Sequence, residues 1–159
     1  MKTLILVRHA KSSWEHHFID HERPLSLRGF KNAEMISNEL KSQINPDLIV
    51  SSEAVRAKTT AEIFIKNLNF NFKKFNVNDD LYDFSGDSLI RVIKNCNDTV
   101  DELMIFGHNN AITNFVNSYG DISIDNVPTC GVTIISFEID RWKDLKRGRT
   151  IKTLFPRDL

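Results

Sequence analysis

The chain opens with MKTLILVRHAKSSW, residues 1–14, in which an apolar run from Leu4 to Val7 stops at Arg8 and His9. A short apolar run with an abrupt polar end is typical of a buried strand that reaches the edge of its sheet. In an open α/β sheet, ligands bind beyond the carboxyl ends of the strands. The charged pair is therefore a candidate functional feature, although a strand that simply reaches solvent would show the same pattern.

Two later segments repeat this pattern of an apolar strand, a short polar turn and a helix. They read LIVSSEAVRAKT, residues 48–59, and LMIFGHNNA, residues 103–111. Because the carboxyl ends of parallel strands meet at one edge of a sheet, we expect Arg56 and His108 to lie near the end of the first strand. The same edge would present backbone N–H groups at the starts of two helices, which attract anions.

The rest of the chain alternates between helical and strand patterns. Apolar residues at steps of three or four predict a helix over 27–44 with Ser26 as its N-cap, and a second helix follows Ser51 and Ser52. The sequence also predicts a strand over 70–77, a polar loop over 79–87, a helix near 88–96, a half-exposed strand over 131–139 and a turn-linked segment around 150–155. This alternation predicts one α/β domain over residues 1–159, a three-layer sandwich with a mostly parallel central sheet and helices on both faces.

Composition narrows the choice of partners. The chain has 159 residues, and its 21 Lys and Arg residues balance its 21 Asp and Glu residues. No global field then attracts nucleic acid or an anionic membrane, so any anion site must be local. The apolar run at the N-terminus is too short for a signal peptide or a membrane span, and we expect a cytoplasmic protein. Cys96 and Cys130 lack the spacing of zinc or redox motifs, so we expect them to be reduced and structural.

Arg8, His9, Arg56 and His108 together describe a pocket for a phosphate group. The planar guanidinium binds phosphate oxygens through two parallel hydrogen bonds, whereas Lys acts as a point charge. An imidazole, with an ordinary pKa of about 6.5, can attack phosphorus and form a covalent phosphohistidine that water hydrolyses. The two guanidiniums and a protonated His108 would meet the charge of the transferring group, so the sequence predicts neither a metal nor a cofactor.

The same segments resemble the histidine phosphatase superfamily, which has a phosphoglycerate-mutase-like fold. The resemblance rests on RHAKSSW, DHERPLSLRG, SSEAVRAKTTAEI and FGHNNAI, in that order, and it is strongest to the SixA-type phosphohistidine phosphatases. It implies that His9 is the nucleophile, that Arg8 and Arg56 clamp the phosphate, and that His108 is the second histidine beside the phosphoryl group. The chain carries Ala10 where the commoner form of the signature has glycine.

The resemblance implies hydrolysis of phosphohistidine on a protein, such as a histidine-containing phosphotransfer domain, through a covalent intermediate on His9. A small-molecule phosphomonoesterase that uses the same pocket is the alternative. A non-catalytic phosphate-binding module is a third hypothesis, which the intact set of two arginines and two histidines disfavours. A mutase is less favoured, because the chain lacks the long insertions with which such relatives enclose a substrate.

Several further residues are candidates for the site. Larger relatives use a carboxylic acid to protonate an ester leaving oxygen, and Asp83 is the best candidate for that role here. Ser12 and Asn109 could contact phosphate oxygens, although Ser12 could equally be a turn residue and Asn109 could orient His108 or cap a helix. Glu15 should point outward, because an inward carboxylate would repel a phosphate group.

Other conspicuous residues have simpler interpretations. The loop before Pro24 carries possible metal ligands, namely His16, His17, Asp20, His21 and Glu22. We expect this cluster to be solvated, with Asp20 and Arg23 pinning the loop together. We expect Trp14 to pack on the sheet rather than line the pocket mouth. A basic cluster near the C-terminus should be solvated rather than a docking surface, and comprises Lys143, Lys146, Arg147, Arg149 and Lys152.

Overall fold

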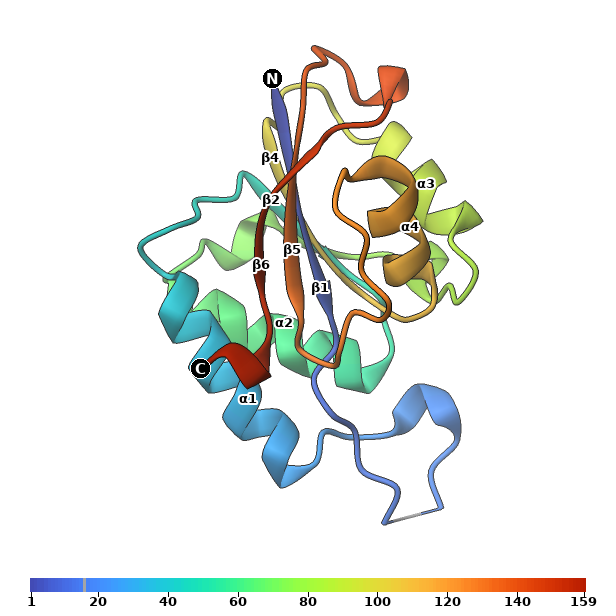
Figure 1. Ribbon diagram of the computed structural model, residues 1–159. Coiled ribbons are helices and arrows are strands. Elements are labelled where there is room, and N and C mark those ends of the chain that lie inside the picture. Colours follow the sequence, from blue (N-terminus) through green and yellow to red (C-terminus); the bar gives the residue numbers. More distant parts are fainter. Residues whose placement is uncertain (16) are drawn as a thin grey trace.

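The computed structural model describes residues 1–15 and 17–159, and its centre is a six-stranded sheet in the order β3-β2-β4-β1-β5-β6 (Figure 1). The strands are β1 (Lys2–Arg8), β2 (Leu48–Ser51), β3 (Phe75–Val77), β4 (Glu102–Gly107), β5 (Val132–Phe137) and β6 (Arg149–Leu154). The apolar run that opens the chain forms β1, which pairs in parallel with β4 and antiparallel with β5. Both edges of β1 are therefore hydrogen-bonded to neighbouring strands.

Helices cover both faces of the sheet. Helices α1 (Leu27–Leu40) and α2 (Val55–Leu68) pack on one face, and α3 (Asp87–Lys94) and α4 (Ala111–Tyr119) pack on the other (Figure 1). Short 3₁₀ helices connect them: η1 (Asp20–Glu22), η2 (Phe72–Lys74), η3 (Asp79–Leu81), η4 (Trp142–Asp144) and η5 (Pro156–Asp158). Leu4 and Leu6 of β1 belong to the core under α3 and α4, whereas Ile5 and Val7 belong to the core under α1 and α2. The predicted three-layer α/β sandwich is confirmed.

The direction of β5 shapes the edge of the sheet where β1 ends. Strands β2, β3 and β4 pair in parallel, but β5 runs against β1. The segment that leads into β5 therefore meets the end of β1. The Arg8 amide donates to the Gly131 carbonyl at 3.1 Å, and the Cys130 amide lies 3.0 Å from the carbonyls of both Arg8 and His9. The sheet is mostly parallel, as predicted, and its antiparallel part closes one side of this edge.

Three predicted elements differ from the structure. Only Phe75–Val77 of the predicted strand over 70–77 pairs as a strand, because the Asn71 side chain accepts from the Lys73 amide and starts η2. The helix predicted over 27–44 ends at Leu40, where a turn follows. β5 was predicted to be half-exposed, but it is mostly buried because it lies between β1 and β6 and supplies side chains to both cores. None of the described helices has the length and hydropathy needed to cross a membrane.

The first turn of α1 lies directly against the backbone that follows β1. The Ser26 side chain accepts from the Gly29 amide at 3.1 Å, which confirms the predicted N-cap. The Ser26 amide donates to the Lys11 carbonyl at 2.9 Å. A Cβ added at Gly29 would collide with that same carbonyl. Glycine is therefore needed at position 29, because the backbone of α1 approaches the backbone of Lys11 closely. Lys11 lies two residues after His9.

We predict that Gly29→Ala destabilises the protein, although the same change inside a solvent-facing helix usually stabilises by about 0.5–1 kcal/mol. The collision with the Lys11 carbonyl should cost roughly 1–3 kcal/mol and lower Tm by several degrees. Thermal unfolding followed by circular dichroism measures the shift. Asn38→Ala, at an exposed position of the same helix, is the control and should leave Tm unchanged or slightly raised. A Gly29→Ala protein as stable as the Asn38→Ala control would contradict this packing.

Candidate active site

The structure brings together the four residues that the sequence selected. Arg8 ends β1 and His9 follows it, His108 follows β4, and Arg56 lies in the first turn of α2. The imidazole rings of His9 and His108 lie 5.3 Å apart between centroids. His9, Arg56 and His108 are only 8 %, 3 % and 1 % exposed, so the group is buried at the edge of the sheet.

The hydrogen bonds of His9 select one tautomer. Its Nδ1 lies 2.7 Å from the Ala10 carbonyl oxygen, which can only accept, so Nδ1 carries the proton. Its Nε2 then has a free lone pair, which faces Nε of Arg56 at 3.4 Å. Burial and the nearby arginines lower the pKa of His9 to about 3, despite the bond to Ala10. His9 is therefore a neutral imidazole with its lone pair directed into the pocket.

His108 takes the opposite tautomer. Its Nδ1 lies 3.4 Å from Nη2 of Arg56, and a guanidinium has no acceptor, so Nδ1 is the unprotonated nitrogen. Its Nε2 then donates to the Ser52 hydroxyl at 2.8 Å. Burial, followed by the proximity of His9 and Arg56, lowers the pKa of His108 to about 3. The sequence predicted a protonated His108, whereas this lowered pKa keeps the ring neutral near pH 7.

The guanidinium of Arg56 is held along two of its edges. The edge formed by Nε and Nη2 faces the lone pairs of His9 and His108, both at the long distance of 3.4 Å. The edge formed by Nη1 and Nη2 donates to the Asp20 carbonyl at 2.6 Å and to its carboxylate at 3.0 Å. A phosphate oxygen between the imidazoles and Arg56 would replace the two long contacts and leave the Asp20 edge intact.

Asp20 joins three segments of the chain, and sequence reasoning found only part of its role. Its carboxylate accepts from Arg23 at 3.0 Å, as predicted, and also from Arg56 and from the Tyr82 hydroxyl. Although burial opposes ionisation, the hydrogen bonds from Tyr82, Arg56 and Arg23 lower the pKa of Asp20 to about 2. Asp20 is thus an ionised carboxylate that fixes the outer edge of Arg56. No periodicity or motif in the sequence connects these positions.

Arg8 retains an unused donor. Its Nη1 donates to the Val127 carbonyl at 2.9 Å. Its Nε is buried and has no hydrogen-bond partner among the described residues, 1–15 and 17–159. An unpaired buried donor of a cation is costly unless a ligand satisfies it. This orphaned nitrogen indicates an anion site beside His9.

Ser12 and Asn109 are tied to protein groups in the structure. The Ser12 hydroxyl accepts from a guanidinium nitrogen of Arg23. The Asn109 carbonyl oxygen accepts from the amide and hydroxyl of Thr113, so it caps the start of α4, and its Nδ2 donates to Asn126 at 2.8 Å.

Asp83, the candidate acid, has a different environment from the one expected. Its two oxygens accept from the amides of Ser85, Gly86 and Leu89, and so hold the first turn of α3. Burial raises its pKa, but these backbone bonds outweigh burial and lower it overall. The structure therefore gives Asp83 a helix-capping role, which does not suit a proton donor. Its neighbour Tyr82 packs edge-on against His108 instead.

The remaining residues of the loop face solvent or one another. Glu15 is exposed, as expected. Trp14 does not pack on the sheet: it is 78 % exposed, and its ring covers the Arg23 guanidinium at 3.2 Å. His16 lies outside the described residues, and His21 contacts Glu53 at 3.5 Å. Among residues 1–15 and 17–159, no three His, Cys, Asp or Glu side chains are placed to hold a metal ion.

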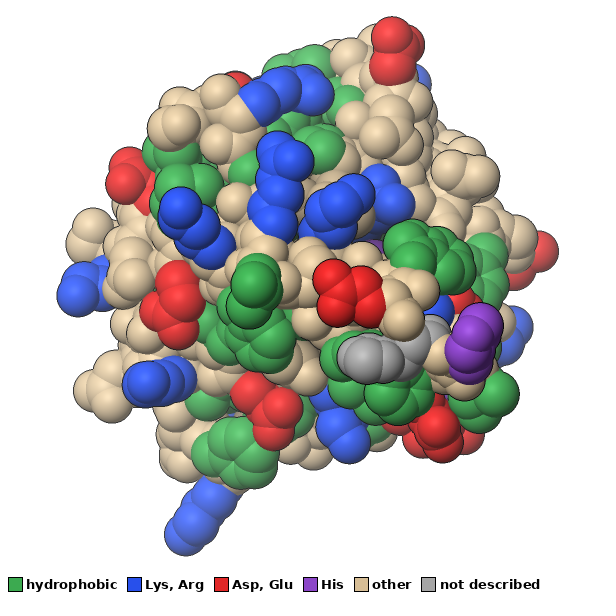
Figure 2. Space-filling view, turned by 90° about the horizontal axis from the view of Figure 1, so that it is seen from below, with side chains coloured by type: hydrophobic (Ala, Val, Ile, Leu, Met, Phe, Trp, Pro, Cys, Tyr) green, Lys and Arg blue, Asp and Glu red, His purple; other side chains and the backbone are tan. Residues whose placement is uncertain are grey.

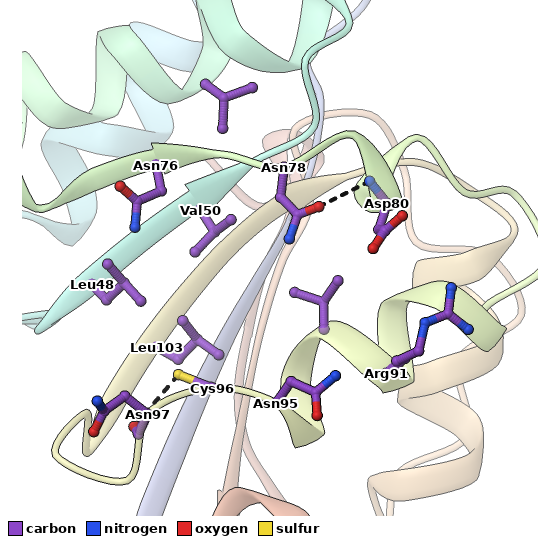
Figure 3. A pocket seen from close by; sticks show the side chains of 12 residues that line it. Leu48, Val50, Asn76, Asn78, Asp80, Arg91, Asn95, Cys96, Asn97 and Leu103 are labelled. Atoms are coloured by element: carbon purple, nitrogen blue, oxygen red, sulfur yellow. Dashed lines mark hydrogen bonds between the residues drawn. The ribbon is translucent and has the colours of Figure 1, made fainter.

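A separate hollow of about 460 Å³ lies between β2, β3 and α3 (Figure 3). Leu48, Val50 and Leu103 form an apolar floor, and asparagine side chains line much of its rim. Its lining holds one arginine, Arg91, and one carboxylate, Asp80, but no histidine. The paired imidazoles and guanidiniums lie elsewhere, so we place the chemistry at the edge of the sheet.

Two imidazoles and two guanidiniums at the carboxyl edge of a three-layer α/β sheet define a protein that handles phosphoryl groups. The chain belongs to the histidine phosphatase superfamily, branch 1, whose family model matches residues 4–89, more than half of the chain. Membership in this superfamily supports phosphatase activity.

Solved structures share the fold over nearly the whole chain. One is a proposed phosphohistidine phosphatase SixA from Agrobacterium tumefaciens, with a TM-score of 0.80, 24 % identity, and coverage of 96 % of this chain and 97 % of that one. Another is the protein histidine phosphatase SixA complexed with tungstate, with a TM-score of 0.80, 18 % identity and 98 % coverage of both chains. A mycobacterial glucosyl-3-phosphoglycerate phosphatase is more distant, with a TM-score of 0.68, 14 % identity, and 94 % and 97 % coverage.

Sequence relatives include proteins of unknown activity. An uncharacterised chloroplast protein of Arabidopsis thaliana is 44 % identical over 61 residues, which are 37 % of this chain and 28 % of that protein. An uncharacterised protein of Mycobacterium tuberculosis is 24 % identical over 153 residues, which are 89 % of this chain and 93 % of that protein.

We predict that ¹⁵N NMR of the ligand-free protein shows His9 protonated on Nδ1 and His108 protonated on Nε2. Both rings should stay neutral from pH 7 to about 4, since their pKa values are lowered to about 3. The unfolded chain binds protons near pH 6.5, so folding stability should fall on acidification below that value. A buried ring that titrated near 6.5 would contradict this description.

Proposed function

We propose that the protein hydrolyses phosphohistidine on a protein substrate through a covalent phosphohistidine at His9. The observation that carries the proposal is the tautomer of His9, whose Nδ1 is engaged by Ala10 while Nε2 presents a lone pair beside Arg56. A neutral imidazole held in this way is a nucleophile at cellular pH. The cations around it would bind the phosphoryl group that it attacks.

In the first step, Nε2 of His9 attacks phosphorus, and the bond from phosphorus to the substrate imidazole breaks. The electron pair of that bond goes to the leaving nitrogen, and the substrate imidazole departs neutral when its other nitrogen holds a proton. His9 becomes a phosphorylated imidazolium, whose Nδ1–H remains bonded to the Ala10 carbonyl. This hydrogen bond strengthens as the ring gains charge, so it favours the transition state.

In the second step, water attacks the phosphorus and the bond to Nε2 breaks. Nε2 recovers its electron pair, Nδ1 keeps its proton, and His9 returns to the neutral tautomer. The proton of the attacking water leaves with inorganic phosphate or passes to solvent. Each step is thus a displacement at phosphorus with an imidazole as a leaving group.

Positive groups of the chain would stabilise the transferring phosphoryl group without a metal. The free Nε of Arg8 and the inner edge of Arg56 supply donors to its oxygens. An arriving phosphate also raises the pKa of His108, which could then donate from Nδ1 as well. Preorganised donors of this kind account for the electrostatic part of phosphoryl transfer catalysis.

The environments of Asp83 and Asp20 favour phosphohistidine over alkyl phosphates as the substrate. An alkoxide leaving group needs a proton donor, but Asp83 is engaged as a helix cap and Asp20 is an ionised partner of two arginines. An imidazole leaves without such help. Between Ser51 and Asp87 the chain forms only α2, β3 and two 3₁₀ turns, so this stretch supplies no inserted domain to enclose a small metabolite.

A turnover screen tests the proposed function against its alternatives. Purified protein with EDTA should release phosphate from phosphohistidine peptides with a kcat/KM about tenfold or more above that for sugar phosphates, which corresponds to about 1.4 kcal/mol in transition-state binding. Equal or faster turnover of a sugar phosphate would identify a small-molecule phosphomonoesterase. Phosphate binding without turnover of either would identify a non-catalytic module.

We predict that His9→Gln abolishes turnover while the protein stays folded. When wild-type protein is mixed with ³²P-labelled phosphohistidine peptide and the reaction is stopped rapidly with alkali, an acid-labile ³²P label should be found on His9. Label on His108 in wild type, or steady turnover by His9→Gln, would overturn the assignment of the nucleophile. His17→Gln, an exposed histidine of the nearby loop, is the matched control and should behave as wild type.

We predict that Arg56→Lys lowers kcat/KM on the order of 10² to 10³-fold, because lysine keeps the charge but loses the planar fork that bridges the imidazoles and Asp20. Steady-state kinetics measures the loss. Arg91→Lys, on the exposed surface of α3, is the control with the same chemical change and should stay within about twofold of wild type. A decrease in kcat/KM of only about twofold for Arg56→Lys would show that the Arg56 side chain does not bind the transferring phosphoryl group.

A further inference from the structure

Two groups of basic side chains lie at opposite ends of the sheet. The C-terminal cluster singled out in the sequence supplies Lys146, Arg147 and Arg149 to a hollow that also contains Met1 and Glu138. Met1 precedes β1, whereas His9 follows β1, so this cluster lies at the end of the sheet remote from the candidate active site (Figure 1). The cluster is mostly exposed, as expected of a solvated group.

A second basic group, which the sequence analysis did not select, surrounds a hollow of about 210 Å³. Lys11, Arg28 and Arg157 line it together with Pro128 and Thr129, and no carboxylate contributes to its lining. All three cations are exposed. None forms an ion pair with another residue in the described ranges 1–15 and 17–159. These residues come from three separate segments, which meet because η5 packs against α1. We call this group the basic hollow.

The basic hollow adjoins the candidate active site. Lys11 lies two residues after His9. Thr129, which also lines the hollow, precedes Cys130, whose amide donates to the carbonyls of Arg8 and His9 at 3.0 Å. Figure 2, which views the molecule from the end where β1 finishes, shows Lys and Arg side chains gathered in the upper half of this face. A molecule bound at His9 would thus extend past a group of uncompensated cations.

We propose that the basic hollow binds acidic side chains that flank the phosphohistidine on a protein substrate. The inference rests on the proposed function and names the surface of the substrate that the chain recognises. Two guanidiniums and one ammonium around one hollow match carboxylates in charge, and guanidiniums bind carboxylates through two parallel hydrogen bonds. The overall charge of the chain is zero, so this attraction is local to the site. Nucleic acid would instead favour an extended basic stripe.

Two phosphohistidine peptides test the proposal, one with three glutamates near the phosphohistidine and one with three glutamines at the same positions. Wild-type protein should show a kcat/KM about fivefold or more higher for the glutamate peptide, and salt should reduce this preference. The variant K11E/R28E/R157E should lose the preference or reverse it. The variant K143E/K146E/R147E changes the net charge equally at the remote end and should keep the wild-type ratio.

The outcomes separate this proposal from the proposed function. If wild type hydrolyses neither peptide nor N-phosphorylimidazole, which has no flanking residues, the proposed function fails. If it hydrolyses both peptides equally, the proposed function stands and the basic hollow has no docking role. An equal loss of preference in K143E/K146E/R147E would show that net charge alone is responsible and overturn the proposal. Equal peptide turnover together with binding of phosphatidylserine vesicles that K11E/R28E/R157E abolishes would assign the hollow to a lipid surface and overturn it too.

Discussion

The guanidinium of Arg56 is the group around which the site is organised. A buried cation is stable only when its hydrogen bonds are satisfied, and Arg56 finds its partners in the two histidine lone pairs and in Asp20. The contact with Arg56 leaves Nδ1 of His108 unprotonated, whereas the Ala10 carbonyl fixes the tautomer of His9. The charge of Arg56 also helps to keep both rings neutral, which the proposed nucleophilic role of His9 requires. Burial contributes most to this neutrality, and Arg56 joins both rings to the segment that carries Asp20.

The sequence was sufficient for the parts of the structure that repeat a local pattern. The apolar runs that end at Arg8 and His108 predicted the strands and the edge where they meet. A buried strand appears in the sequence as consecutive apolar residues, and its end appears as the polar residues that follow. The ion pair between Asp20 and Arg56 corresponds to no pattern in the sequence, since a single contact between distant segments creates no periodicity. The hydrogen bonds of Asp83 were hidden for a related reason: the sequence showed a carboxylate near the site but not the amides that it binds.

The distribution of charge illustrates why net charge says little about this molecule. The chain is neutral overall, yet it presents basic groups at both ends of β1. The group near His9 is assembled from Lys11, Arg28 and Arg157, which are far apart in sequence and therefore did not stand out. The group that did stand out, near the C-terminus, lies at the other end. A run of charged residues in a sequence shows charges that are close along the chain. Recognition of a partner depends instead on charges that are close in the folded structure.

The central position of β1 determines how the site can be lost. The Arg8 amide donates to Gly131, just before β5, and the His9 amide donates to Gly107, which ends β4, so the backbone around the proposed nucleophile is bonded on both sides. Exchange of these amide hydrogens requires separation of the innermost strands, which is an opening of the whole core rather than of a loop. The backbone of the proposed nucleophile is therefore expected to exchange among the slowest amides of the protein. Fraying at the chain ends therefore leaves the backbone of His9 in place.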